Sequence, residues 1–530
     1  MVLISRALRT RPVQGLIRHS AAIRARRFTE RDPLSAQRAI FHRLVCMAGG
    51  TLFGRDHDFP GLTRLPYDQA YARFQQQVPI RTYQDFWNEY FQAGCHTGLD
   101  GRKRICLENV TWPGRIRMFC ETSGTTAPTK YIPFSCQMFA ENRKAATDMI
   151  SCYLAVQGAS RIGSGKILYM SGSTELNDMG DDICSGDMSA ITLRFRPRWL
   201  DPFVEPQPNI SALPWDEKLQ AMAELLINDH DIRVISGVPP WIILLLKRCA
   251  ELGNKPLREL LPHLELIIHG GTSIKPYRNE FEELFDGRLP NLLELLPSSE
   301  AFMAFQQQGD DQMRLTPYYG AFFEFVRFED LDEQGRPAKG AAAIPLDQVQ
   351  VGQRYAVILS TCSGLWRYHI GDTIRFTSLA PYFIEFTGRD RFLDKLEEKV
   401  TQGEVERAIA ELNTVGSWNV REFMVGADVP ARRHVWVLAT AETGGNIDQA
   451  AQLLDTALCD MNADYATFRN QGRINQPLLL VTGEGAIYEW SKTVRGKLGG
   501  QTKIPHIDPT PDSSMIASLR EFVAPGCCAN

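Results

Sequence analysis

Short apolar runs alternate with helix-like stretches through the middle of the chain. The runs KILYMSG, IRVISGVPP and LELIIHGGTS begin at residues 166, 232 and 264 and end in glycine, serine or proline, which predicts buried strands followed by turns. Residues 239–252 and 276–285 have the apolar spacing of helices. Strand, helix and strand in series predict a largely parallel sheet covered on both faces.

The segments before and after this region have different patterns of apolar and polar residues. Residues 32–92 are mainly helical in pattern, and residues 354–377 and 381–392 read as antiparallel strands. From Leu393 a polar segment opens a second unit with its own helices and strands. A chain of 530 residues exceeds the size at which one core stops growing. We therefore expect an N-terminal domain over residues 1–387 and a C-terminal domain over residues 388–530.

Composition narrows the class of protein. With 44% hydrophobic and 23% charged residues and a net charge of −4, the chain reads as a globular protein without the basic face of nucleic-acid binders. No run approaches 18 consecutive apolar residues, which predicts no membrane span. The twelve cysteines include no C-x-x-C pair, and we expect them to be reduced, in the cytoplasm.

The first 29 residues are rich in arginine and contain no acidic residue before Glu30. Such a start is typical of a mitochondrial transit peptide, and also of a surface helix that opens the first domain. We favour the surface helix.

The segment CETSGTTAPTKYIPFS, residues 120–135, crowds small hydroxyls around Gly124 and Lys130. Backbone N–H groups, hydroxyls and a lysine can together hold a phosphate, although the same residues also build ordinary turns. A Walker A loop needs a second glycine and a hydroxyl directly after the lysine, where this chain has Tyr131. A P-loop NTPase is therefore disfavoured.

Three other stretches carry chemistry. Glu300 in LPSSEAF follows an apolar run and suits a magnesium ion held between a carboxylate and substrate phosphates, or else caps a helix. Asp372 in WRYHIGD can accept two ribose hydroxyls, or belong to an ordinary turn. Lys497 and Lys503 flank Gly499 and Gly500, as in a flexible tip that reaches a phosphate or in a solvated loop.

In order and spacing these motifs resemble the adenylate-forming ligases. TSGTTAPTK is similar to their phosphate loop, SSEAF to their magnesium glutamate, YHIGD to their ribose aspartate, and GRDRFLDKLEEKVTQGEVE to the hinge before their mobile domain. Further blocks such as TLFGRDHDF, HGGTSIKPYRNEFEEL and GKLGGQTKIPHI resemble the auxin-responsive Gretchen Hagen family of acyl-acid amido synthetases, in its bacterial form. The resemblance covers residues 40–510.

That resemblance implies an α/β adenylate-forming ligase fold: mixed and parallel sheets flanked by helices, a β-barrel-like subdomain and a smaller, mobile α+β C-terminal domain. It implies a monomer that uses ATP and Mg2+ to activate a carboxylic acid as its acyl-adenylate and transfers the acyl group to an amine, usually of an amino acid. Glu300 would hold the metal. The implied catalytic residues are Lys503, Glu324, Lys130 and Lys497, with Glu324 placed by the nucleotide phosphate or the incoming amine. The implied nucleotide contacts are Ser123, Gly124, Thr125, Thr126, Gly270, Gly271, Ser298, Ser299, Asp372, Phe386, Arg389 and Lys399.

Some departures and alternatives remain open. Glu397 and Glu398 stand where the hinge of relatives often has a glycine, which weakens the expected contact of Lys399 with the nucleotide. The acyl pocket is expected to be lined by Phe302, Met303, Phe322 and Trp241, or these residues belong to the core. A ligase that uses coenzyme A as acceptor is the second reading, and a non-catalytic nucleotide-binding protein is the third.

Overall fold

The computed structural model describes residues 10–97, 103–122, 129–171, 176–307, 312–332, 335–389, 392–393, 395–396, 398, 400–416, 418–440, 445–495, 504–510 and 512–523. Its helices are α2 (Arg11–Thr29), α3 (Pro33–Ala48), α4 (Leu52–Asp56), α5 (Phe59–Leu62), α6 (Tyr67–Gln77), α7 (Tyr83–Phe86), α8 (Cys136–Val156), α9 (Met188–Arg194), α10 (Pro208–Ser211), α11 (Trp215–Asn228), α12 (Pro239–Gly253), α13 (Leu257–Leu260), α14 (Arg278–Leu284), α15 (Gln402–Val415), α16 (Ile447–Met461), α17 (Ala463–Asn470), α18 (Ala486–Thr493) and α19 (Ser514–Val523).

The strands divide among sheets of different size. They are β1 (Cys95–Thr97), β2 (Lys103–Ile105), β3 (Met118–Thr122), β4 (Lys130–Phe134), β5 (Lys166–Tyr169), β6 (Asn177–Gly180), β7 (Ile183–Gly186), β8 (Val204–Glu205), β9 (Ile232–Gly237), β10 (Leu266–Gly270), β11 (Asn291–Pro297), β12 (Phe302–Gln306), β13 (Met313–Leu315), β14 (Ala321–Arg327), β15 (Ala343–Pro345), β16 (Arg354–Thr361), β17 (Tyr368–Leu379), β18 (Tyr382–Arg389), β19 (Phe392–Leu393), β20 (Val400–Thr401), β21 (Val420–Asp428), β22 (Arg433–Thr440) and β23 (Leu478–Gly483).

One twelve-stranded sheet runs through the N-terminal part of the molecule, in the order β15-β14-β16-β17-β18-β13-β12-β11-β10-β9-β5-β8. Strands β8, β5, β9, β10 and β11 are parallel to one another, as the alternation of strands and helices predicts. From β12 onward the neighbours are antiparallel. The antiparallel strands expected in a barrel-like subdomain therefore continue the same sheet.

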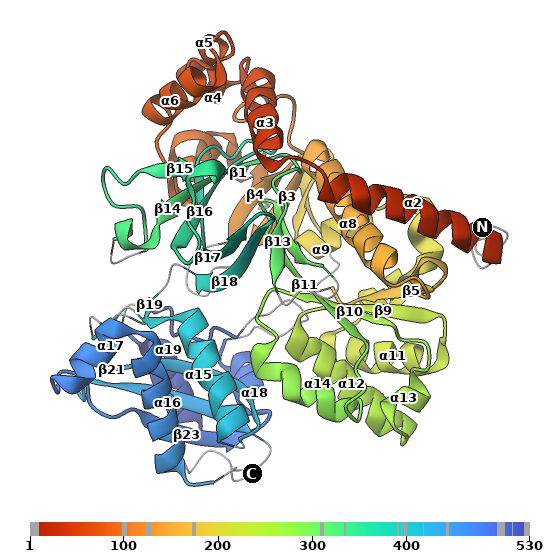
Figure 1. Ribbon diagram of the computed structural model, residues 1–530, viewed down its shortest axis with the longest axis vertical. Helices are drawn as coiled ribbons and strands as arrows, with labels where there is room; N and C mark the ends of the chain where they lie inside the picture. The colour runs from red at the N-terminus through yellow and green to blue at the C-terminus, as the bar shows by residue number, and fades with distance from the viewer. Residues whose placement is uncertain are drawn as a thin grey trace.

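Helices cover both faces of the parallel half (Figure 1). Side chains alternate along β10, so that Ile267 joins the core beneath α11 to α14, whereas Leu266 and Ile268 join the core beneath α2 and α8. A parallel sheet buried on both faces requires such continuous apolar strands. The arginine-rich helix α2 lies along α8 and buries its small or aromatic residues there, as a surface helix does.

A smaller sheet, in the order β4-β3-β7-β6, lies beside the helical N-terminal region. Its strands share one core with α3 to α7, built largely from aromatic residues. The β3–β4 hairpin in this sheet joins Thr122 to Lys130, which pair across the two strands. The serine- and threonine-rich segment is therefore the connection of this hairpin.

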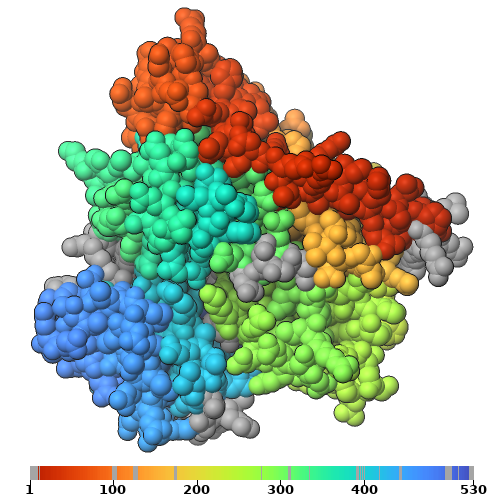
Figure 2. Space-filling view, viewed as in Figure 1, coloured from red at the N-terminus to blue at the C-terminus, as the bar shows by residue number. Residues whose placement is uncertain are grey.

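The C-terminal unit has its own three-stranded sheet, in the order β21-β22-β23. One face packs against α15, α16 and α17, and the other against α18 and α19. In the space-filling view this unit is a separate blue lobe beside the green lobe that holds α12 to α14 (Figure 2). Two independent cores of this kind are typical of a domain.

Within the described ranges, no helix is both long and apolar enough to cross a membrane. The cysteines of these ranges are free thiols.

Candidate functional site

The parallel strands β5, β9, β10 and β11 end at one edge of the large sheet. Because ligands of open α/β sheets bind beyond the carboxyl ends of the strands, this edge is the expected binding site. Three buried polar atoms at this edge have no hydrogen-bond partner among the residues that the structure describes: Ser171 Oγ, Thr272 Oγ1 and His269 Nδ1. Buried polar groups without partners are rare in folded proteins, and a bound ligand would supply the missing bonds.

Burial also sets the protonation of His269. The imidazole is 1% exposed, and desolvation lowers the pKa of His269 to about 3. The ring is therefore neutral at physiological pH.

The turn after β10 requires its two glycines for different reasons. A Cβ atom on Gly270 would lie 2.5 Å from the carbonyl oxygen of Leu295 in β11. Gly271 has a φ of +87°, a backbone conformation that residues other than glycine rarely adopt. Both glycines thus shape the turn itself, and their expected contact with the nucleotide stays a prediction.

Ser298 closes the turn that presents Glu300. Its hydroxyl accepts hydrogen bonds from the backbone N–H groups of Ala301, at 3.0 Å, and Glu300, at 3.3 Å. The backbone N–H of Ser298 donates in turn to the carbonyl of Ala301 at 2.9 Å. Glu300, 9% exposed, is therefore held on a turn that its own neighbours build, and the hydroxyl of Ser298 is largely used in that turn.

The β3 side of the hairpin is electrostatically coupled to this glutamate. After desolvation, the charge of Glu300 is the largest influence that raises the pKa of the buried Cys120 thiol on β3. Cys120 precedes Ser123 by three residues, whereas Lys130 begins β4 on the other side of the connection. Residues 123–126 lie outside the described part of the chain.

Lys130 is the first residue of β4 in that hairpin. Its ammonium lies 5.7 Å from the centre of the Tyr83 ring. Desolvation lowers the pKa of His369 to about 4, the charge of Lys130 adds to the lowering, and the charge of Asp332 opposes it. Since Asp372 follows His369 by three residues on the same strand, the lysine and the expected ribose aspartate share one region.

Asp372 is 8% exposed and directly follows Gly371, which has a φ of +83°. Across the strand pair Asp372 lies opposite Arg389, and Ile374 lies opposite Phe386. The structure thus brings the backbones of three expected nucleotide contacts together on β17 and β18. It describes the backbone of Arg389 but not its side chain. Lys399, Lys497 and Lys503 lie outside the described residues.

Glu324 has an environment that argues against its expected contact with a phosphate or an amine. The carboxylate is 1% exposed. It accepts hydrogen bonds from the hydroxyl of Tyr71 at 2.9 Å, from Gln75 at 3.2 Å and from Nε of Arg367 at 3.0 Å. Arg367 is itself 5% exposed, so the pair is a buried ion pair. A carboxylate with these partners holds α6 against the sheet.

Sequence reasoning missed a buried lysine at the same edge. Lys218 on α11 is 2% exposed, and its ammonium donates to the carbonyl of Ser171 at 3.3 Å. Burial lowers its pKa to about 8, while the charge of Asp187 opposes that effect. The signal was available: Lys218 occupies an apolar position of its helix, between Trp215 and Met222.

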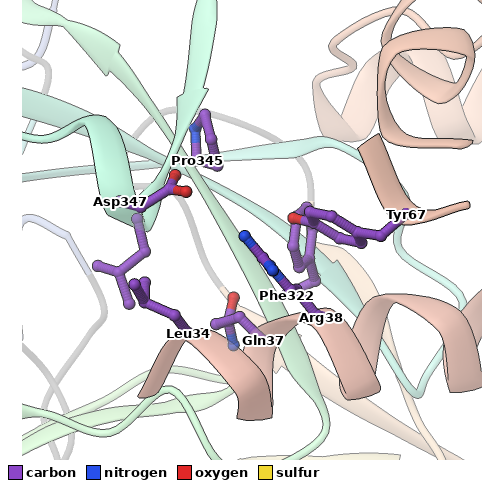
Figure 3. A pocket seen from close by; sticks show the side chains of 8 residues that line it. Leu34, Gln37, Arg38, Tyr67, Phe322, Pro345 and Asp347 are labelled. Carbon is purple, nitrogen blue, oxygen red and sulfur yellow. The ribbon is translucent and has the colours of Figure 1, made fainter. Parts of the chain in front are cut away.

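The expected acyl-pocket residues do not gather in one place. Trp241, Phe322, Met303 and Phe302 belong to four different hydrophobic clusters. Phe322 lines a small pocket between α3, α6 and the end of β15, with Arg38 and Asp347 among its walls (Figure 3). None of the residues that line this pocket comes from the ends of β5, β9, β10 or β11.

The residues at the strand ends fit a magnesium ion that is shared with a substrate. Among the described residues there is no cluster of three histidine, cysteine or acidic side chains that could hold a metal alone. Magnesium is ordinarily bound by one or two carboxylates together with phosphate oxygens and water. Glu300, beside the hairpin of the phosphate-loop segment, offers one carboxylate of this kind.

Three domain models of one protein family match this chain over residues 24–255 and 315–511. The GH3 family N-terminal domain matches residues 24–255, the GH3 family central domain residues 315–389 and the GH3 family C-terminal domain residues 382–511. Indole-3-acetic acid-amido synthetase GH3.10 of Arabidopsis thaliana is 30% identical over 189 residues, or 34% of this chain and 32% of that protein. The matched segment thus covers about a third of the length of that curated relative.

Two solved structures share the fold over nearly their full length. A structure of the GH3.15 acyl acid amido synthetase matches with a TM-score of 0.70 and 17% identity, covering 92% of this chain and 93% of that one. A structure of 2-hydroxyisobutyryl-CoA ligase in the postadenylation state matches with a TM-score of 0.57 and 12% identity, covering 94% of both chains. The large mixed sheet flanked by helices is therefore the fold of adenylate-forming ligases.

Proposed function

Because the chain belongs to the GH3 family, we propose that it is an ATP-dependent acyl-acid amido synthetase. It activates a carboxylic acid as an acyl-adenylate and then transfers the acyl group to an amine, most simply the α-amine of an amino acid. The amido synthetase names of its relatives and the fold shared with adenylate-forming enzymes support this proposal.

One observation carries the proposal. Glu300 follows β11 at the edge where the parallel strands end, and its charge raises the pKa of Cys120 on β3, the strand that leads into the serine- and threonine-rich segment. A carboxylate and a hydroxyl-rich connection at one sheet edge suit a nucleotide triphosphate with its metal ion. The unsatisfied atoms of Ser171 and Thr272 lie at the same edge and would bond a substrate.

In the first step an oxygen of the acid attacks the α-phosphorus of ATP, and the bond to the β-phosphate oxygen breaks to release pyrophosphate. The attacking carboxylate and the phosphates repel each other, so cationic and hydrogen-bonding groups must neutralise and align them. Magnesium, held by Glu300, would supply charge neutralisation when bound. Ser123, Thr125 and Thr126 would bond phosphate oxygens, with Lys130 adding charge, and Asp372 would accept the ribose hydroxyls.

In the second step the amine attacks the acyl carbon, and the bond to the phosphate oxygen breaks to release AMP. The ammonium form must lose its proton before it can attack. With Glu324 engaged by Arg367, Tyr71 and Gln75, we assign this carboxylate to structural support and leave proton removal to a group nearer the strand ends. Lys503, with Lys497 as second choice, would stabilise charge on the phosphate.

The remaining expectations form part of the same proposal. The C-terminal domain, residues 388–530, would move between the two steps, and the enzyme would act as a monomer in the cytoplasm. Free thiols in the described ranges accord with a reducing compartment. Size-exclusion chromatography with light scattering tests the monomer directly.

Pyrophosphate release tests the proposal. The purified protein is incubated with ATP, Mg2+ and a panel of carboxylic acids, alone, with mixed amino acids, or with coenzyme A. Acid-dependent release that rises with amino acids supports the amido synthetase. Release that rises only with coenzyme A would reassign the protein as a thioester ligase, and no release with any acid, despite ATP binding, would leave the non-catalytic reading.

A further inference from the structure

A buried polar cluster joins the C-terminal unit to the N-terminal one, and Glu422 on β21 is at its centre. The hydroxyl of Tyr488 on α18 donates to Oε2 of Glu422 at 2.9 Å. Nε2 of His506 lies 3.3 Å from Oε1 of the same carboxylate. Both Glu422 and His506 are 2% exposed. A single buried carboxylate therefore bonds two segments that are distant in the sequence.

The other side of the imidazole is also paired. Nδ1 of His506 lies 2.8 Å from Oε1 of Glu406 on α15, and the ring stacks on Phe423 with a centroid distance of 4.1 Å. Burial alone would lower the pKa of His506, but hydrogen bonds and charges from Glu406 and Glu422 outweigh it and raise the pKa to about 9. His506 is therefore an imidazolium between two carboxylates at neutral pH.

Tyr277 of the N-terminal unit lies at the same cluster. This tyrosine, 2% exposed, ends the short helix Lys275–Tyr277, which begins four residues after Gly271 and contacts both β21 and α15. Its pKa is raised by burial first, and then by the charges of Glu422, Glu406 and Glu280. The segment that follows the turn after β10 therefore packs against the two elements that carry Glu422 and Glu406.

Further ion pairs surround this cluster at the seam. Arg421, next to Glu422, lies 2.9 Å from Glu280 on α14, and Lys247 on α12 lies 2.8 Å from the other oxygen of Glu280. Lys247 also pairs with Glu484, just before α18. Tyr488 packs against the ring of Trp241 on α12, with a centroid distance of 5.4 Å. The orientation of α18 is thereby tied to α12 and α14.

We propose that Glu422 is a positioning residue for the adenylating reaction: by bonding Tyr488 and His506 together it holds the C-terminal unit where β21 and α15 contact residues 275–277, just after the turn that ends β10. The inference rests on the proposed function for its catalytic readout. Lys497 and Lys503 lie in the sequence between Tyr488 and His506. Tyr488 before these lysines and His506 after them are therefore bonded to the same carboxylate.

Two variants separate positioning from folding. Glu422→Gln keeps the size of the side chain and removes the charge that faces His506, whereas Tyr488→Phe removes only the hydrogen bond from α18 to Glu422. Asp216→Asn is the matched control, because Asp216 makes an exposed contact across the same seam, 3.1 Å from Lys492, without touching the cluster. Thermal unfolding at pH 7 identifies any variant that does not fold.

The first readout is kinetic. We expect Glu422→Gln and Tyr488→Phe each to lower kcat of acid-dependent pyrophosphate release about tenfold, as the loss of one hydrogen bond to a charged group would, with KM for ATP changed less than about twofold. In Glu422→Gln the alkaline limb of the pH profile should also move to lower pH by roughly one pH unit, because His506 keeps only Glu406 as an anionic partner. Asp216→Asn should match the parent enzyme in both.

The second readout needs no activity. NMR titration of histidine-labelled protein, with the His506 signal assigned from a His506→Gln variant, should show that Glu422→Gln lowers the pKa of His506. Hydrogen exchange should become faster in α18 and at Asp508, whose N–H donates to Val425 at 2.8 Å. If these changes occur and kcat and the alkaline limb do not move, the cluster only stabilises the seam and the proposal is overturned. If the parent enzyme shows no acid-dependent turnover, the proposed function fails instead, while the NMR result still tests the cluster.

Discussion

Replacing Glu324 by alanine removes an acceptor from two buried donors and one half-buried donor at once. The hydroxyl of Tyr71, the amide of Gln75 and Nε of Arg367 all donate to this carboxylate, at 2.9 to 3.2 Å. Gln75 keeps an acceptor at the carbonyl of Ala343, and Arg367 keeps the carbonyls of Gln75 and Val78. Arg367 nevertheless loses its only carboxylate partner among the described residues. Breaking a buried ion pair on one side costs about 3–5 kcal/mol.

Unfolding measurements check this value. A loss of that size should lower the Tm of the N-terminal unit by roughly 4–6 °C. Glu324→Gln, which keeps the shape and part of the hydrogen bonding, should lose less than Glu324→Ala. The control is Glu282→Gln on α14, since Glu282 forms an exposed pair with Arg278 at 3.2 Å and should cost no more than about 0.5 kcal/mol.

Activity at a temperature where the variants are folded decides between support and catalysis. If Glu324 only holds α6 against the sheet, folded Glu324→Gln should retain acid-dependent pyrophosphate release and amide formation within a few fold of the parent enzyme. A Glu324→Gln protein with an unchanged Tm and no amide formation would refute this reasoning. It would restore the carboxylate to the amine-binding role that the family resemblance implies.

Four other substitutions test single steps of the argument. Lys503→Ala should lower acid-dependent pyrophosphate release about 10²–10³-fold, and a larger loss in Lys497→Ala would exchange the roles of the two lysines. Glu300→Gln should raise the Mg2+ concentration for half-maximal release on the order of tenfold or more, and an unchanged magnesium dependence would remove Glu300 from the metal site. Gly270→Ala places a Cβ 2.5 Å from the carbonyl oxygen of Leu295 and should cost about 1–3 kcal/mol in urea unfolding; no loss would contradict the close approach of β10 and β11. Because burial lowers the pKa of Lys218 to about 8 in the folded protein, the unfolded chain binds more protons between pH 8 and 10.5, so the parent protein should gain up to about 3 kcal/mol over that interval relative to Lys218→Met. If the Tm values of the two proteins change by the same amount across this interval, burial does not lower the pKa of Lys218.

The strands and turns of the large sheet could be predicted because their signals are local. The apolar runs at 232–240 and 264–273 contain β9 and β10, and the helix predicted over 239–252 is α12 within one residue. A run of buried aliphatic residues with a glycine after it needs no information from elsewhere in the chain. The parallel order of these strands followed from the same alternation and is confirmed.

Local sequence patterns could not predict that the parallel and antiparallel strands join in one sheet. The strands of residues 354–389 look independent in sequence, yet β18 pairs with β13 and so continues the parallel half through β12 and β11. Pairing between strands about 70 residues apart depends on tertiary packing, which no local period encodes. Trp241 and Phe322 belong to different hydrophobic cores for the same reason, since tertiary packing decides which core an apolar residue joins.

The roles of acidic residues were the hardest to assign, because a carboxylate in a motif and a carboxylate in an ion pair look alike in a sequence. Glu300 and Glu324 both stand in or just past an apolar run, but the nearest partners of Glu324 are Tyr71 on α6 and Arg367 just before β17, 253 and 43 residues away in the chain. Glu422 is bonded to Tyr488 and His506 in the same way, across 66 and 84 positions. A buried carboxylate needs such partners to remain charged. The residues that supply them therefore decide whether a carboxylate is available to a substrate, and for Glu324 both oxygens accept hydrogen bonds from within the protein.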